Sequence, residues 1–295
     1  MKKQLNAICY GEILWDVFPD GKTLGGAPLN VALRLQSLGA DVKMISKLGS
    51  DNLAEETLNA LADFNFDTSL IQTDKELETG AVLVTLDKSG SASYEIKEPV
   101  AWDTIELTND NKKAVSETDL FIFGSLAARS KTSKNTLLKL IELATFTVFD
   151  VNFRKPHYHL KKVLELMNTA HLVKMNEEEL EEICSYLNHK DSSFEKKLAF
   201  LSKQTNTETI CVTRGDAGAV LYQNGRLFTH PGYPVKVLDT VGAGDSFLAG
   251  LLFQLSKQQN PEKALAFACA MGSLVASKKG ANARISTEEI TQKMA

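Results

Sequence analysis

The sequence predicts an α/β protein in which helices flank a central, mostly parallel sheet. Strand-like and helix-like patterns alternate along most of the 295 residues, as they do in chains built from βαβ units. The length suits one large domain or two small ones, and either can bury a sizeable core. Only seven prolines are present, and no Pro/Gly-rich stretch indicates a linker. We therefore expect residues 1–295 to form a single domain.

Residues that typically start, cap or end helices mark the boundaries of the expected elements. Pro28 is placed in the first turn of the first helix, Gly39 ends that helix, and Asp51 is placed to cap the second. In chain order, the expected strands are 5–10, 42–48, 119–124, 145–151, 171–175 and 209–213. The expected helices are 28–38, 53–64, 132–143, 158–168, 176–187 and one that begins at about residue 243. A hairpin around Asn224-Gly225 is expected to extend the edge of the sheet.

One further hairpin breaks the α/β alternation. The β-rich runs 80–87 and 91–97 flank a turn of sequence Asp-Lys-Ser-Gly at 87–90. Such a hairpin is either an ornament on the sheet edge or a lid over the carboxyl ends of the strands, where open α/β folds bind ligands. We expect a lid, with its strands drawn from about 12–24 and 80–100.

Composition excludes several classes of protein. Lys and Arg number 33 against 37 Asp and Glu, a net charge of -4 with no basic stripe for nucleic acid. No apolar run reaches the roughly 18–20 residues that a membrane span needs. The four cysteines lie far apart without Cys-x-x-Cys spacing, which predicts neither disulfides nor structural zinc. We expect a cytoplasmic enzyme that binds neither nucleic acid nor membrane.

The segment 239–252, DTVGAGDSFLAGLL, carries the strongest chemical signal. The small residues Gly242, Ala243 and Gly244 open an apolar helix, and unhindered amides at a helix start form an anion site. Asp245 lies in the first turn. It either caps the helix or takes a proton from a hydroxyl while the amides stabilise a transferring phosphoryl group.

A second cluster opens the first helix. Gly25 and Gly26 let a ligand approach the backbone closely, and Asn30 offers both donors and an acceptor. Asp16 follows the first strand, where a carboxylate can accept two hydroxyls of a polyol. A simpler alternative stays open for each feature. The cluster that opens the helix is then only a tight turn before it, and Asp16 is only an exposed loop residue.

These residues resemble a known family. The segments 25–51 (GGAPLNVALRLQSLGADVKMISKLGSD) and 239–252 are similar to the two signatures of the ribokinase-like, or PfkB, carbohydrate kinases. The resemblance extends over essentially the whole chain and is strongest with bacterial fructokinases. It implies a three-layer ribokinase-like fold with a small β lid, and ATP and Mg²⁺ as cofactors.

The resemblance also implies roles for particular residues. Asp245 falls on the catalytic base, and residues 242–244 fall on the anion hole. The residues that match sugar-binding or substrate-binding positions are Asp16, Gly25, Gly26, Asn30 and Arg154.

Further matches concern the nucleotide. Asn176 and Glu179 match an Asn-x-x-Glu motif that organises magnesium and phosphate, with Glu179 reaching the metal largely through water. A solvated, dipole-favoured helix start is the alternative for this acidic run. The residues that match a nucleotide-contacting turn are Thr213, Arg214 and Gly215.

A monovalent cation, such as K⁺, is implied beside the anion hole. Asp239 matches one of its ligands, and the loop around Gly280 would supply the others. Arg284 stands near where some members of the family have a small or hydroxyl residue. Activation by potassium and its absence therefore both stay open.

The resulting prediction is an ATP-dependent sugar kinase that phosphorylates the primary hydroxyl of fructose to fructose 6-phosphate. Alternatives are the same reaction on ribose, a nucleoside or 2-keto-3-deoxygluconate, and a sugar-binding regulator without turnover. The expected partners are the sugar and ATP. A homodimer through the lid and a monomer are both compatible with the sequence.

Overall fold

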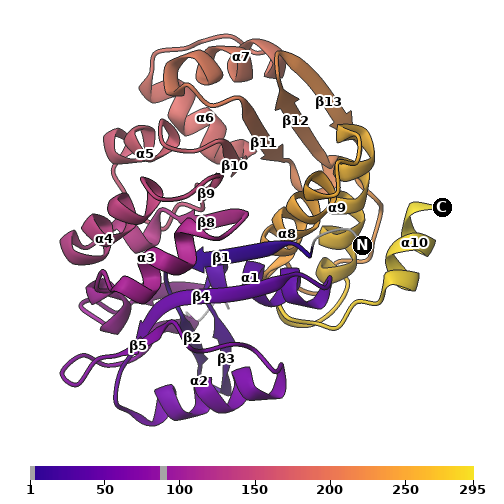
Figure 1. Cartoon of the computed structure of the whole chain (residues 1–295). Helices are drawn as coiled ribbons and strands as arrows, with labels where there is room; N and C mark the ends of the chain where they lie inside the picture. Colours follow the sequence, from indigo (N-terminus) through magenta and orange to yellow (C-terminus); the bar gives the residue numbers. More distant parts are fainter. Residues whose placement is uncertain (1–3, 87–91) are drawn as a thin grey trace.

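The computed structural model describes residues 4–86 and 92–295. The turn expected at 87–90 lies outside the described residues. Within these ranges the strands form two sheets, one large and one small, and helices pack on both faces of the large sheet (Figure 1).

The large sheet is mostly parallel, as predicted. Its nine described strands are hydrogen-bonded in the order β13-β12-β11-β10-β9-β8-β1-β4-β5. Their bounds are β1 Asn6–Tyr10, β4 Asp41–Leu48, β5 Ile71–Thr73, β8 Leu120–Gly124, β9 Thr147–Asp150, β10 Leu172–Asn176, β11 Thr209–Thr213, β12 Ala219–Gln223 and β13 Arg226–His230. Only β12 and β13 run antiparallel to their neighbours. The hairpin predicted at Asn224-Gly225 joins these two strands at the sheet edge and is confirmed.

Most of the helices fall into two groups by the face of the large sheet on which they pack. Those described are α1 Ala27–Ser37, α2 Asn52–Asp63, α3 Asn109–Ser116, α4 Lys131–Ile141, α5 Leu160–Met167, α6 Glu177–Tyr186, α7 Phe194–Thr205, α8 Ala243–Ser256, α9 Pro261–Ala276 and α10 Thr287–Met294. Residues of α3 to α7 pack on one face of the sheet, and residues of α1, α2, α8 and α9 pack on the other. Helix α10 packs on α9 in a separate small cluster. This arrangement is the predicted three-layer architecture.

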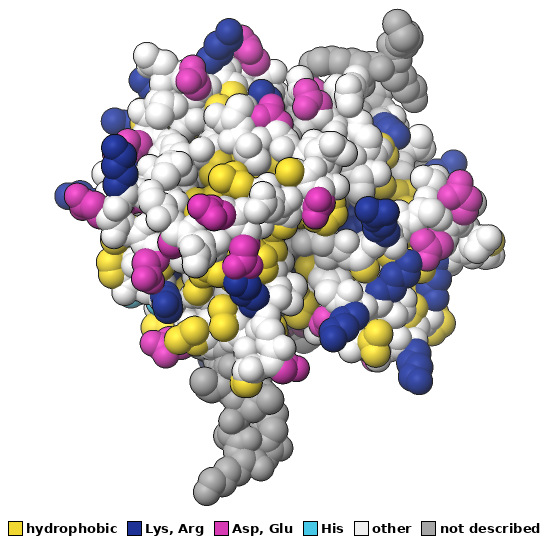
Figure 2. Space-filling model, turned by 90° about the horizontal axis from the view of Figure 1, so that it is seen from below, with side chains coloured by type: hydrophobic (Ala, Val, Ile, Leu, Met, Phe, Trp, Pro, Cys, Tyr) yellow, Lys and Arg dark blue, Asp and Glu magenta, His cyan; other side chains and the backbone are white. Residues whose placement is uncertain are grey.

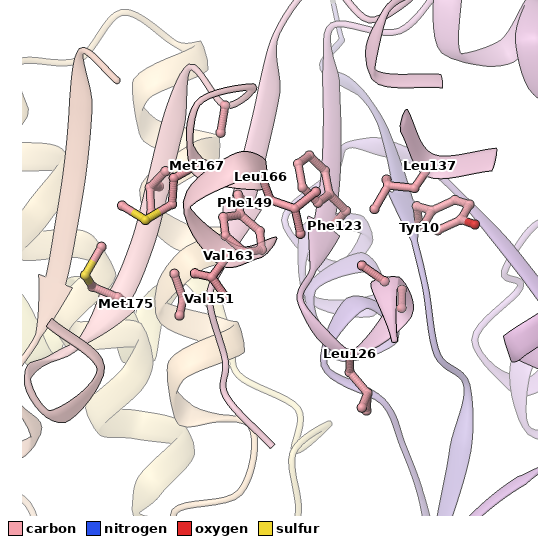
Figure 3. Packing of buried hydrophobic residues seen from close by; sticks show 14 of the residues in the cluster. Tyr10, Phe123, Leu126, Leu137, Phe149, Val151, Val163, Leu166, Met167 and Met175 are labelled. Carbon is pink, nitrogen blue, oxygen red and sulfur yellow. The ribbon is translucent and has the colours of Figure 1, made fainter. Parts of the chain in front are cut away.

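Each strand of the large sheet contributes side chains to the clusters on both faces, because successive side chains point to opposite faces. Phe121 and Phe123 of β8 join the cluster under α4 and α5, whereas Leu120 and Ile122 join the cluster under α1 and α8. The rings of Phe123 and Phe149 stack with their centroids 5.3 Å apart (Figure 3).

The small sheet contains the segments that the sequence assigned to a lid. Its strands are β2 Leu14–Phe18, β3 Gly21–Gly25, β6 Gly80–Leu86 and β7 Ala92–Ile96, in the order β3-β2-β6-β7. The β6-β7 pairing is antiparallel, so the predicted hairpin is confirmed. β2 and β3 lie below the large sheet in Figure 1.

The packing of α1 against α8 places the N-termini of these two helices side by side. Leu29 and Leu33 of α1 share one buried cluster with Leu248 and Leu252 of α8. This contact brings the N-termini of two helices together from opposite ends of the chain. None of the helices in the described residues is long and apolar enough to cross a membrane.

Candidate active site

Asp245 lies in the first turn of α8 and faces the start of α1. Its Oδ2 accepts a hydrogen bond of 2.8 Å from Nδ2 of Asn30. The N-cap of α8 is Gly242, without a side-chain capping bond, so Asp245 is not the helix cap that the simpler alternative required. Two of the predicted residues, 215 positions apart in sequence, thus meet at one point.

Burial raises the pKa of the Asp245 carboxyl to about 6, and the neighbouring Asp150 also raises it. Lys174, the hydrogen bond from Asn30 and Arg154 act in the opposite direction. A carboxyl with this pKa is mostly ionised at neutral pH yet holds a proton more readily than an exposed aspartate. These are the properties of a general base near physiological pH.

The glycine turn at 242–244 is shaped by close packing. Gly242 has φ 74°, and a Cβ on it would lie 2.6 Å from Cα of Ala281. The amide of Ala243 donates to the carbonyl of Thr240, whereas an α-helix offers Gly244 no intrahelical acceptor. The first turn of α8 therefore presents an N–H group and the positive end of a helix dipole beside Asp245.

A buried ion pair behind this turn was not predicted from the sequence. Nζ of Lys174 in β10 lies 3.0 Å from Oδ1 of Asp150 at the end of β9, and both side chains are almost fully buried. The available signal was a charged residue inside each apolar strand, since unpaired charges are rarely buried.

Asp16, on β2, is positioned beside the start of α1. Its Oδ2 lies 3.0 Å from where a Cβ on Gly25 would stand, so the absent side chain leaves room next to the carboxylate. Burial raises the pKa of Asp16 and Arg154 lowers it. Arg154 is exposed, and its Nη1 donates to the carbonyl of Phe153.

Gly26 is the N-cap of α1 with φ 112°, and a Cβ there would overlap the carbonyl oxygen of Glu12. Glu12 is, like Lys174 and Asp150, a residue that sequence reasoning did not assign. It is 2% exposed, and its Oε2 has no hydrogen-bond partner among the residues that the structure describes. Burial raises its pKa to about 7; its own amide, Arg154 and the amide of Ala27 lower this pKa, and Asp245 raises it. An acidic residue directly after a buried strand was the available signal.

Asn176 and Glu179 form a capping box at the start of α6. Each side chain accepts the backbone N–H of the other at 2.8 Å. Oε1 of Glu179 also accepts the N–H of Phe153 at 2.7 Å. The motif thus ties the loop after β9, which carries Arg154, to the end of β10.

The turn after β11 lies next to this capping box, because Thr213 pairs in register with Asn176. Arg214 in that turn lies 3.6 Å from a carboxylate oxygen of Glu177, and its guanidinium is 4.7 Å from the centroid of the Phe194 ring. Gly215 has φ 57°, and a Cβ placed on it would point into open space. The predicted nucleotide-contacting residues therefore stand together at the ends of β10 and β11.

Asp239 joins two loops. Its carboxylate accepts N–H groups from Val241 at 3.0 Å and from Gly280 at 2.9 Å. Asp239 and the loop around Gly280, which the sequence predicts to lie together, are therefore in contact. The direct partners of the carboxylate are backbone amides.

The carboxylates of Asp150 and Glu179 offer oxygen atoms, which are the ligands that a hard cation such as Mg²⁺ prefers. Asp150 and Glu179 both lie near enough to Lys174 to raise its pKa, although burial alone lowers it. In the ranges 4–86 and 92–295, no three His, Cys, Asp or Glu side chains are arranged to hold a metal directly. Magnesium commonly keeps several waters and binds one or two carboxylates together with substrate phosphates. The residues present fit that mode of binding.

A large mostly parallel sheet, a small accessory sheet and a carboxylate at a glycine-rich helix start define a kinase of small molecules. Residues 4–288 match the family described as pfkB family carbohydrate kinase. The chain belongs to this family and is a sugar kinase.

Known relatives agree with this assignment. A putative sugar kinase of Pyrococcus horikoshii is 32% identical over 87% of this chain and 82% of its own length. A probable fructokinase of Arabidopsis thaliana is 27% identical over 97% of this chain and 96% of its own length.

Solved structures share the fold. The fructokinase of Xylella fastidiosa with bound ATP superposes with a TM-score of 0.87 at 23% identity, over 100% of this chain and 98% of that one. A sugar kinase of Pyrococcus horikoshii superposes with a TM-score of 0.83 at 29% identity, over 98% and 99%. The predicted ribokinase-like fold is confirmed.

Proposed function

We propose that this sugar kinase transfers the γ-phosphoryl group of ATP to the primary hydroxyl of fructose. The observation that carries the proposal is the meeting of Asp245 with Asn30 at the joined N-termini of α1 and α8. Support for fructose comes from relatives named fructokinase, which align along nearly all of the chain.

In the proposed reaction, the carboxylate of Asp245 takes the proton of the primary hydroxyl as the oxygen attacks the γ-phosphorus. A new P–O bond forms to the sugar while the bond from the γ-phosphorus to the β-γ bridging oxygen breaks, and ADP leaves with that electron pair. The helix start at 242–244 stabilises the negative charge on the transferring group. Asp16, Asn30 and the backbone at Gly25 and Gly26 hold the sugar hydroxyls, in reach of Arg154.

The nucleotide is proposed to lie over the ends of β10 and β11, near Asn176 and the turn of Thr213, Arg214 and Gly215. Glu179, with Asp150 nearby, would hold magnesium through water. When bound, the ion neutralises phosphate charge. The small sheet is proposed to close over the sugar and exclude competing water.

Arg129 bears on the choice of substrate. An acidic sugar such as 2-keto-3-deoxygluconate needs a free cation, and the sequence offers Arg129 and Arg154 as candidates. Arg129 is committed elsewhere: its Nη2 lies 2.7 Å from Oδ2 of Asp103, and its guanidinium stacks on Trp102. This commitment removes one of the two candidates and leaves Arg154 for an acidic sugar.

The test is ADP release from ATP and Mg²⁺ over fructose, ribose, 2-keto-3-deoxygluconate and adenosine, with Asp245→Asn beside the wild type. Fast turnover on fructose that collapses in the variant supports both the substrate and the base. Turnover on another member of the panel would replace fructose. Sugar binding without any turnover would overturn the catalytic proposal in favour of a regulator.

A homodimer through the small sheet stays a prediction. Its edge strand β3 is exposed at residues 21–23, and the face in Figure 2 shows hydrophobic side chains among charges of both signs. Lys22 on this edge pairs with Glu56 at 2.7 Å, and a charged edge is typical of strands that avoid pairing. Light scattering after gel filtration distinguishes a dimer from a monomer.

A further inference from the structure

The loop that follows α9 reaches the predicted base through a chain of two amides. Nδ2 of Asn282 donates to Oδ1 of Asn30 at 3.2 Å, and Nδ2 of Asn30 donates to Oδ2 of Asp245 at 2.8 Å. An amide side chain has an acceptor on one side and donors on the other. A donor that occupies Oδ1 of Asn30 therefore selects the orientation in which the NH₂ group faces Asp245.

Arg34 of α1 forms hydrogen bonds to the backbone of the same loop. Nη2 of Arg34 donates to the carbonyls of Ala281 at 3.3 Å and Ala283 at 2.9 Å, the two residues that flank Asn282. Its Nε donates to Oγ of Ser246 in α8 at 3.0 Å. One planar guanidinium thus joins α1, α8 and the loop, a geometry that its fixed set of donors suits.

Arg34 is 4% exposed, and among residues 4–86 and 92–295 no carboxylate pairs with it. Burying a cation against neutral acceptors costs free energy. Apolar packing between α1 and α8 would avoid that cost, so the guanidinium contributes something other than packing. What it holds is the backbone on either side of Asn282.

We propose that Asn282 and Arg34 are positioning residues for the reaction: Arg34 holds the loop, and Asn282 orients Asn30 so that its NH₂ group faces Asp245. The proposal rests on the proposed function, in which Asp245 accepts the proton of the sugar. It deepens that function by adding two residues that lie outside the segments 25–30 and 242–245.

The expected effect follows from the groups that face Asp245. Asp150 of β9 raises its pKa, while Lys174 of β10 and Arg154 lower it. Glu12, after β1, is a further carboxyl nearby, and Asp245 raises its pKa. Asn30 adds a donor that favours the ionised form. Turning the amide of Asn30 around would replace this donor by an acceptor and disfavour ionisation.

Asn282→Asp is the sharpest test, because an aspartate at 282 demands a donor from Asn30 and reverses its amide. Asn282→Ala removes the constraint without reversing it. Ala283→Asp is the matched control, since it adds the same charge to the same loop without a side chain on Asn30. The pKa of Asp245 is measured by ¹³C NMR titration of the unliganded protein, and kcat/KM for the best sugar is measured against pH.

The pKa of Asp245 and the acid limb of kcat/KM are expected to rise by about one unit or more in Asn282→Asp, and by less in Asn282→Ala. Ala283→Asp should move both by much less than Asn282→Asp. Arg34→Met should shift them in the direction of Asn282→Ala, with recovery in Arg34→Lys. If Arg34→Met does not fold, the position 282 variants decide alone.

Equal pKa values in Asn282→Asp and Ala283→Asp would overturn the proposal, because a merely structural loop changes the unfolding midpoint and leaves the titration of Asp245 in place. The NMR titration needs no turnover. A wild-type protein that phosphorylates no sugar would therefore refute the proposed function while the titration still decides the roles of Asn282 and Arg34.

Discussion

Lys174 and Asp150 form an ion pair inside the large sheet, directly behind the turn that begins α8. The Nζ of Lys174 lies 3.0 Å from Oδ1 of Asp150 and 3.3 Å from the place that a Cβ on Gly244 would take. Burial alone favours the neutral amine, but Asp150, Glu179 and Asp245 together raise the pKa of Lys174. A fixed positive charge therefore stands behind the amides that are proposed to stabilise the charge on the transferring phosphoryl group.

Removal of this cation has consequences for both stability and activity. In Lys174→Met, Asp150 stays buried without its partner, and we expect a loss of about 3–5 kcal/mol in the free energy of unfolding. The pKa of Asp245 should rise, because Lys174 lowers it. Urea denaturation measures the first effect and the pH dependence of kcat/KM the second.

The matched control is the double variant Lys174→Met with Asp150→Asn, which leaves no unpaired charge. It should regain most of the lost stability but not the activity. Loss of stability without any loss of activity in Lys174→Met would show that the ion pair serves the fold alone.

Asp245→Asn should lower kcat by about 10²–10⁴-fold, the contribution of a general base. The same substitution should stabilise the fold at pH 8. The folded-state pKa of about 6 lies above the ordinary 3.8, so the charged carboxyl costs the folded state up to about 3 kcal/mol above pH 6.

This stability difference should shrink as the pH falls from 6 towards 3.8, because the carboxyl is then protonated in the folded state. Denaturation curves of both proteins at pH 8 and pH 4.5 measure it. A variant that is less stable than the wild type at pH 8 would contradict the direction of the shift.

The pH profile of the wild type should show an acid limb near pH 6, since the proposed reaction requires Asp245 to be ionised. Glu12→Gln should leave this limb in place, because Glu12, with a pKa of about 7, is still mostly protonated while Asp245 titrates. Steady-state rates from pH 4.5 to 8.5 test both statements. A limb that moves in Glu12→Gln would show that Glu12 is ionised while Asp245 titrates.

Gly242→Ala should impair the helix start in two ways. Its φ of +74° disfavours a side chain, and the new Cβ would lie 2.6 Å from Cα of Ala281. We expect destabilisation by about 1–3 kcal/mol and a fall in kcat of roughly tenfold or more as the turn shifts. Thermal unfolding and initial rates provide the two measurements.

Gly39→Ala controls for backbone strain alone, because Gly39 has φ +95° and, its two chain neighbours aside, no atom of the described residues lies within 4 Å of the new Cβ. It should lose stability without losing activity. Equal losses of activity in Gly39→Ala and Gly242→Ala would refute a special role for the turn at 242.

Local signals predicted the elements whose ends carry strong caps. Asp51 caps α2 through the N–H of Ala54, as expected, and Pro28 stands in the first turn of α1. The helix α9 escaped prediction, although Asn260 caps it, because its residues are apolar on most sides and lack the polar face that reveals a helical period. The helices α3, α7 and α10 were also not assigned.

The sequence by itself determined which groups are able to act: a carboxylate after two glycines at a helix start, paired glycines before another helix, and an acidic run after a strand. Such features depend on a few neighbouring residues, so their chemistry can be recognised in order along the chain. Arg34 and Asn282 carry no such local signature, and Glu12 and Lys174 carry only a charge after or inside an apolar strand.

Only the tertiary structure decided what these groups face. The order of strands in the sheet and the packing of α1 on α8 set Asn30 against Asp245, Lys174 behind Gly244, and Asn282 on Asn30. Contacts of this kind join segments that are far apart in sequence. They depend on how whole elements pack, and the pKa of the base depends in turn on the burial and the charges that this packing places around it.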